Sequence, residues 1–194
     1  MGRHVGLLGG TFDPPHVGHL VVAESARVDL GLDQVRLLVA GDPWMKRTVG
    51  EAHHRVAMAQ AAVVDDAHLH VDARETERDG PTYTVETLEA LHHEEPDVTW
   101  HFLLGADTTA RLDEWQRIED AYRLARFVAV TRPGHEVRLD PVAAQHVDEL
   151  EVPRLEISST ELRARYAEGR ATRYLVPEAV DRYVRRHQLY DAVG

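Results

Sequence analysis

The sequence predicts an α/β protein in which helices cover both faces of a parallel sheet, a doubly wound, Rossmann-like fold with a helical C-terminal part. Short apolar runs alternate along the chain with longer segments of helical periodicity, and glycine or proline turns separate them. Because crossovers between parallel strands are right-handed, this alternation favours a doubly wound sheet. Ligands of such folds bind beyond the carboxyl ends of the strands.

The elements follow one another in a regular order. Strands are expected at 5–8, 35–39, 68–72, 99–104 and 127–131. Helices are expected at 19–30, 53–64, 84–92, 159–167 and 178–186, with a helical region over 107–124. The stretch from Pro133 to Pro153 looks rich in loops. No linker or repeat divides the chain, so a single domain over 1–194 is the expectation.

The amino-acid composition limits the classes of function that the protein can have. With 43% hydrophobic residues, the 194-residue chain can bury a substantial core. It contains no cysteine, which excludes disulfides, thiolate metal sites and cysteine nucleophiles. A formal net charge of -11 disfavours nucleic-acid binding. No apolar run is long enough for a signal peptide or membrane span, so a soluble cytoplasmic protein is expected, without a membrane partner.

The segment 9–19, GGTFDPPHVGH, combines a strand end, a glycine turn and a helix start. Gly9 and Gly10 leave no Cβ in the way of a phosphate, and the N–H groups of the new helix attract an anion. His16 and His19 are three residues apart, so both imidazoles lie on one face of the helix start. The segment therefore predicts a phosphate site.

Other interpretations of the segment are weaker. A glycine turn after a strand is often only structural, and two histidines at this spacing can bind metal. No third ligand stands nearby in the sequence, however, so no metal site is predicted. The signatures GxxxxGK[ST] and GxGxxG are both absent from it.

Segment 9–19 resembles the HxGH signature of the nucleotidyltransferases that transfer AMP or CMP from a nucleoside triphosphate, and its full form resembles nicotinate-nucleotide adenylyltransferases. The resemblance implies that Gly9, Gly10, Thr11 and Phe12 bind substrate and that His16 and His19 act in catalysis.

Two further motifs follow strands. After 35–39, Lys46 could deliver a charge to a phosphate, although a solvated surface lysine is the simpler interpretation of this stretch alone. The family has PPHK there, whereas Trp44 and Met45 stand in place of its second proline and histidine. In 79–88, Thr84 can cap a helix. The similar family segment (S/T)YTxxTL implies that main-chain groups near Thr84 meet the nicotinate carboxylate.

Strand 99–104 runs into Gly105 and Asp107. A carboxylate in this position can bind ribose hydroxyls or cap the next helix. Trp115 can belong to the core; the resemblance implies instead that its indole stacks on the pyridine ring. Arg132, in an RPG segment like that of the family, sits at the same sheet edge, where a structural ion pair is an equal alternative.

In segment 157–163, ISSTELR, Ser158 or Ser159 can cap a helix. Arg163, one turn later, can donate hydrogen bonds to phosphate oxygens. It closely resembles the ISSTxIR motif that holds the ATP phosphates in the family. Farther on, apolar positions suit either the core or a homo-oligomer interface: Leu175, Val180, Val184 and Leu189.

The resemblance implies transfer of AMP from ATP to nicotinate mononucleotide, giving nicotinate adenine dinucleotide and pyrophosphate, and we expect Mg²⁺ to arrive with ATP. His16, His19, Lys46 and Arg163 are the expected catalytic residues. Another HxGH nucleotidyltransferase, of the pantetheine-phosphate or cytidylyltransferase type, is the nearest alternative. A nucleotide-binding sensor without turnover is the alternative from another class.

Overall fold

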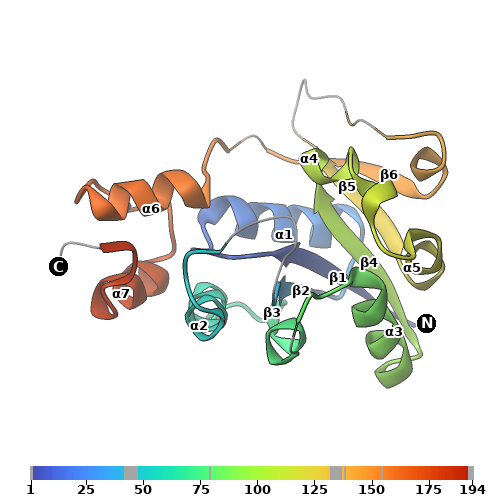
Figure 1. The fold of residues 1–194 in the computed structure, drawn as a ribbon, viewed down its shortest axis with the longest axis horizontal. Coiled ribbons are helices and arrows are strands. Elements are labelled where there is room, and N and C mark those ends of the chain that lie inside the picture. The colour runs from blue at the N-terminus through green and yellow to red at the C-terminus, as the bar shows by residue number, and fades with distance from the viewer. Residues whose placement is uncertain are drawn as a thin grey trace.

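The protein is built on a six-stranded parallel sheet with the strand order β3-β2-β1-β4-β5-β6. The computed structural model describes residues 2–41, 48–78, 80–131, 137, 139–153 and 155–191, with only the backbone of 106 and 107. The strands are β1 (Arg3–Gly10), β2 (Gln34–Val39), β3 (Leu69–Asp72), β4 (Val98–Gly105), β5 (Arg126–Thr131) and β6 (Val147–Glu151). The predicted fold class is confirmed, and the chain reverses its direction across the sheet between β1 and β4 (Figure 1).

Helices cover both faces of the sheet, because the central strands carry apolar side chains on both sides. On one face, α1 (Val17–Asp29) and α2 (Ala52–Ala62) pack on a cluster that includes Leu8 and Leu37. On the other face, α3 (Thr84–Glu94) and α5 (Ile118–Leu124) pack on a cluster that includes Leu7.

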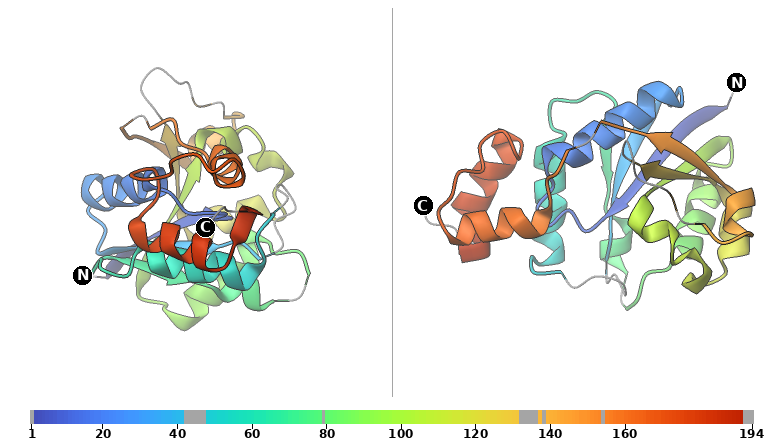
Figure 2. Two further views of the ribbon diagram at one scale, coloured as in Figure 1. Left: turned by 90° about the vertical axis from the view of Figure 1, so that its left-hand side faces the viewer. Right: turned by 90° about the horizontal axis from the view of Figure 1, so that it is seen from above.

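The C-terminal part forms a third core against α2. It consists of α6 (Ser159–Ala167), α7 (Glu178–Arg186) and the 3₁₀ turn η4 (Leu189–Asp191). Figures 1 and 2 show α6 and α7 together at one end of the molecule, away from α5. Val180 and Val184 are fully buried there, and Leu175 and Leu189 pack against them. These four positions therefore belong to the core, which was one of their two predicted roles.

Two expectations about secondary structure were wrong. The stretch 133–153, interpreted as loop, contains the 3₁₀ turn η3 (Ala143–Gln145) and strand β6, which pairs with β5. The expected helical region 107–124 is broken into α4 (Ala106–Thr109), η2 (Leu112–Glu114) and α5. Arg117, the N-cap residue of α5, has a left-handed φ of 51°, so α5 does not continue the preceding helical turns. Within the described residues, no helix has the length and apolar character needed to cross a membrane.

Candidate active site

A cavity of about 170 Å³ opens at the carboxyl ends of β1, β2 and β4, where the winding of the sheet changes direction. Six of the predicted site residues line it: Gly9, Gly10, Thr11, Thr84, Gly105 and Trp115. Tyr83 and the buried Glu75 contribute to the same wall. The cavity therefore joins the end of the first strand to the predicted pyridine pocket.

The turn after β1 packs closely on the glycine that ends the strand. Phe12 has a left-handed φ of 51°, and its buried ring folds back over Gly10. A Cβ on Gly10 would lie 3.0 Å from that ring. Phe12 thus packs in the core, edge-on to the His19 ring at 5.1 Å between centroids, and its side chain does not line the cavity.

His16 and His19 lie together at the start of α1, as their spacing predicted. His16 is the N-cap residue, and the two rings stack with centroids 3.7 Å apart. The His16 backbone N–H donates to His19 Nδ1 at 3.1 Å. In the neutral ring the proton of His19 is therefore on Nε2, which is a hydrogen-bond donor. Gly18 leaves room for this pair, because a Cβ there would lie 2.9 Å from His16 Nδ1.

The start of α6 lies against the turn that precedes α1. Ser158 caps α6 by accepting the Glu161 N–H at 3.2 Å, which confirms one of the predicted caps. Ser159 Oγ donates to the Pro14 carbonyl at 2.9 Å. Arg163 donates to the Asp13 carbonyl at 2.7 Å and to Thr160 Oγ1 at 3.1 Å. The N-termini of two helices, α1 and α6, are thus joined through one turn.

The opposite wall of the cavity is the start of α3. Thr84 is the first residue of α3, and Tyr83 is its N-cap, so the predicted cap by Thr84 was wrong. The N–H groups of a first helical turn have no acceptor within the helix, so those near Thr84 are suited to an anionic group.

Trp115 lies in the turn between η2 and α5. Its ring is edge-on to Phe102 at 5.9 Å and to Phe127 at 6.4 Å between centroids, which fixes one edge of the indole in the core. Another part of the side chain lines the cavity. Trp115 therefore contacts the core and lines the cavity at the same time.

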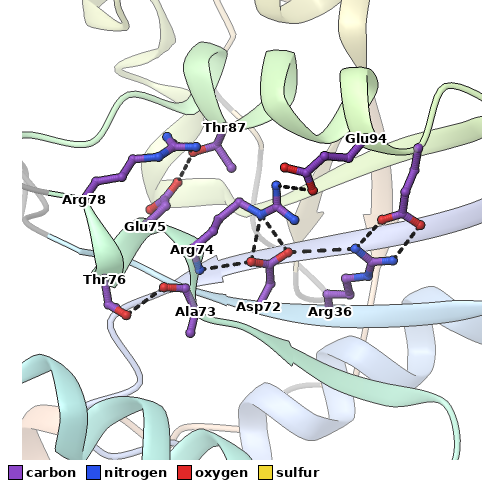
Figure 3. A network of polar contacts seen from close by, with 10 residues as sticks. Arg36, Asp72, Ala73, Arg74, Glu75, Thr76, Arg78, Thr87 and Glu94 are labelled. Atoms are coloured by element: carbon purple, nitrogen blue, oxygen red, sulfur yellow. Dashed lines mark hydrogen bonds and ion pairs between the residues drawn. The ribbon is translucent and has the colours of Figure 1, made fainter.

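Glu75, which sequence reasoning missed, lines the cavity together with residues 82–84. It is 7% exposed and accepts the Thr87 hydroxyl at 2.8 Å, while Arg78 donates to the same hydroxyl at 3.2 Å (Figure 3). Burial raises the pKa of the Glu75 carboxyl, and hydrogen bonds from Thr87 and Thr82 oppose that rise. Glu75 lies in a charged run, RETERD, that is typical of a solvated surface, so the sequence offered no signal for its burial.

An ion-pair chain flanks this group. Arg74 pairs with Asp72 at 2.9 Å and with Glu94 of α3 at 3.0 Å, and Arg36 pairs with Glu95 at 2.7 Å (Figure 3). These contacts join the carboxyl end of β3 to the last turn of α3. They support the segment that carries Glu75, because Arg74 is its neighbour in the chain.

Arg55 is a second residue that sequence reasoning missed. It is 1% exposed, and its guanidinium donates to four carbonyl oxygens, of Thr11, Ala40, Gly41 and Gly50, at 2.6 to 3.2 Å. Burial lowers the pKa of Arg55, and the nearby Asp13 carboxylate opposes this effect. One side chain thereby connects the turns that follow β1 and β2.

The remaining predicted site residues are Lys46, Asp107 and Arg132. Lys46 and Arg132 lie outside the described residues. Asp107 lies inside α4, whose N-cap is Gly105, so the alternative role of Asp107 as a helix cap was wrong. In the part of the chain that the structure describes, no group of three or more His, Cys, Asp or Glu side chains could hold a metal ion.

Comparisons with known proteins agree on one family. The cytidylyltransferase-like family model matches residues 7–165. A probable nicotinate-nucleotide adenylyltransferase of Leifsonia xyli is 42% identical over 98% of this chain and 95% of its own length. A second one, of Herpetosiphon aurantiacus, is 40% identical over 97% and 98%.

Solved structures resemble this fold as well. The Plasmodium falciparum nicotinic acid mononucleotide adenylyltransferase complexed with NaAD superposes with a TM-score of 0.80 over 98% of both chains, at 19% identity. The same enzyme complexed with APC gives a TM-score of 0.78 over 98% of both chains, at 18% identity.

Proposed function

The chain belongs to the nicotinate-nucleotide adenylyltransferases, a branch of the cytidylyltransferase-like family, and from this premise we propose how its residues divide the work. The enzyme transfers AMP from ATP to nicotinate mononucleotide, giving nicotinate adenine dinucleotide and pyrophosphate in NAD biosynthesis. The stacked His16–His19 pair at the start of α1 carries the proposed assignment, because the turn that leads to it begins at the cavity residues Gly9, Gly10 and Thr11. We assign the whole of 1–194 to one nucleotidyltransferase domain.

The phosphates bind on the side of α1 and α6. The 5′-phosphate of the mononucleotide attacks the α-phosphorus of ATP in line and expels pyrophosphate. The nucleophile is already an anion, so the reaction requires positioning and charge stabilisation rather than a general base. His16 and His19 donate to the phosphoryl oxygens as their charge develops. The tautomer imposed by the His16 N–H, which makes Nε2 of His19 a donor, supports this role.

The remaining phosphate contacts come from the basic residues and the cap of α6. Arg163 and Lys46 hold the outer phosphates, and Ser158 and Ser159 offer the N-terminus of α6 to the same anion. The contacts of Ser159 and Arg163 with the turn before α1 support this assignment, because they put α6 beside the histidines. Mg²⁺ accompanies ATP and neutralises part of its phosphate charge, so we treat it as part of the substrate.

The nucleosides bind toward β4 and α3. Trp115 stacks on the pyridine ring, and N–H groups at the start of α3 meet its carboxylate. The lining of the cavity by both Trp115 and Thr84 supports this placement. Gly9, Gly10, Thr11, Phe12 and Gly105 contact substrate mainly through the backbone. Asp107 binds ribose hydroxyls, and we assign Arg132 to substrate binding as well.

Replacing Trp115 with leucine is expected to raise the KM for nicotinate mononucleotide by about fivefold to tenfold, because an aromatic stack is worth roughly 1 kcal/mol beyond area burial. The KM for ATP should stay near its normal value. Steady-state kinetics with each substrate varied in turn measures both constants. Trp115→Phe serves as the control, since it keeps an aromatic face and should show a smaller change. Equal increases in both KM values would contradict a pyridine pocket at Trp115.

The acceptor is tested by pyrophosphate release with ATP and Mg²⁺ in the presence of nicotinate mononucleotide, nicotinamide mononucleotide or phosphopantetheine. We expect clear preference for the nicotinate acid, because helix N–H groups favour a carboxylate over an amide. Preference for phosphopantetheine would leave the histidine mechanism in place and remove the pyridine pocket. Tight ATP binding without turnover on any acceptor would instead indicate a nucleotide sensor.

A further inference from the structure

Asp13 lies at the back of the turn that leads to the two histidines, and its side chain is directed into the protein. It is 1% exposed. Its carboxylate accepts the Val49 N–H at 2.7 Å and the Gly50 N–H at 3.1 Å. A Cβ on Gly50 would lie 2.6 Å from Asp13 Oδ1, so this close approach requires glycine. The carboxylate therefore ties the turn after β1 to the segment that precedes α2.

The third donor to Asp13 comes from the far end of the chain. The Tyr190 hydroxyl donates to Asp13 Oδ1 at 2.6 Å, across 177 positions of sequence. Burial and the Asp13 carboxylate both raise the pKa of Tyr190, so its hydroxyl keeps its proton and remains a donor. The short contact is typical of a charge-assisted hydrogen bond.

The backbone around Tyr190 has an unfavourable conformation that contacts with other residues must stabilise. Gln188, Tyr190 and Asp191 have φ values of 50°, 59° and 56°, a left-handed conformation that residues other than glycine seldom adopt. Such conformations persist where surrounding contacts hold them, and they gather at functional sites. Here the ring of Tyr190 packs on the C-terminal core beside Met58, and its hydroxyl reaches the turn before α1.

Other contacts from the C-terminal part reach the same turn. Ser159 and Arg163 bind the carbonyls of Pro14 and Asp13, and the Val17 N–H donates to the Leu175 carbonyl at 3.0 Å. Each of these holds the backbone of 13–17, whereas Tyr190 alone among them holds the Asp13 carboxylate. Contacts from the C-terminal part thus hold the turn that leads to His16 and His19 at the start of α1.

We propose that Tyr190 and Asp13 form a positioning pair that sets the turn 13–16, and with it the donors of His16 and His19, for attack on the α-phosphorus. Neither residue touches the substrate. The proposal rests on the phosphate role given above to the two histidines. It assigns η4, the last described element of the chain, to the support of the reaction, although Tyr190 does not line the cavity.

The test compares two tyrosine variants of the full chain. Tyr190→Phe removes the hydroxyl that binds Asp13. Tyr166→Phe is the matched control, because Tyr166 belongs to the same C-terminal core, where it is more deeply buried than Tyr190, and its hydroxyl donates to a carboxylate, that of Asp181, at 3.0 Å. The two variants lose the same kind of buried contact, but only one of the contacts involves the turn.

Two readouts are needed, kinetics and amide hydrogen exchange. Because small misplacements of reacting groups are costly, we expect Tyr190→Phe to lower kcat roughly tenfold to a hundredfold with an unchanged KM for nicotinate mononucleotide. Backbone amides in 9–19 should exchange faster in this variant than in the unmodified protein. Tyr166→Phe should leave kcat and this exchange near normal, even where its melting temperature falls.

The outcomes separate the positioning role from stability and from the assigned reaction. Equal loss of kcat in both variants would overturn the proposal, because the effect would then come from loosening of the C-terminal core. A normal kcat or unchanged exchange in 9–19 for Tyr190→Phe would overturn it as well. If the unmodified protein released no pyrophosphate, the proposed function would fail, and the exchange comparison would still decide whether Tyr190 holds the turn.

Discussion

Replacing His19 with alanine is expected to reduce kcat by about a hundredfold to a thousandfold, the usual loss when one preorganised donor to a transition-state oxyanion is removed. The free energy of unfolding should fall by only about 1 kcal/mol, the worth of a helix cap. This small loss is expected because His19 accepts the His16 N–H but is only partly buried. Pyrophosphate release and urea denaturation measure the two quantities on the same preparation.

Two controls sharpen this experiment. His19→Gln keeps an N–H donor at the end of its side chain and should retain more activity than the alanine variant. His54→Ala removes a histidine from α2 that contacts Tyr183 and lies outside the proposed site, so kcat should be near normal. A folded His19→Ala protein with ordinary turnover would show that His19 does not stabilise the transition state.

The largest effect on stability is expected for Arg55→Met, which should lower the free energy of unfolding by about 3–5 kcal/mol. Methionine fills much of the same volume but donates no hydrogen bond. The carbonyls of Thr11, Ala40, Gly41 and Gly50 would lose their shared donor, and the buried Asp13 carboxylate would lose its nearby positive charge. Buried groups left without partners in this way are costly.

Urea denaturation followed by circular dichroism measures this loss. Arg182→Met is the matched control, since Arg182 also lies on a helix but its side chain is 70% exposed, and it pairs with Glu178 on the surface. Exposed pairs of this type contribute little. A change for Arg55→Met as small as that for Arg182→Met would mean that water or other groups satisfy the four carbonyls.

The central sheet could be predicted because its strands are buried on both faces and therefore appear as continuous apolar runs. Strand β6 could not. Its sequence, VDELE, buries Val147 and Leu150 but leaves three acidic residues exposed at the edge of the sheet, so it lacks both the apolar run and the alternation of a strand. The break in the region 107–124 was also hidden, because the left-handed Arg117 carries no glycine or proline signal.

The residues of the candidate site also include some that could be predicted from the sequence and some that could not. His16, His19 and Ser158 were predictable because short-range geometry sets their positions at helix starts. Arg55, Glu75 and Tyr190 were not, because each is brought to the site by packing between distant segments. A charged side chain at helical spacing is normally solvated. Only the folded chain reveals that four backbone carbonyls surround Arg55.

The acidic side chains of the edge strand β6 affect how two copies of this protein can associate. An outer strand leaves one row of backbone groups open to pairing, and a second molecule can extend the sheet there. Asp148, Glu149 and Glu151 are all exposed on this strand. Two such strands brought side by side would confront carboxylates with carboxylates. The composition that hid β6 from sequence reasoning thus also works against end-to-end growth of the sheet into fibres.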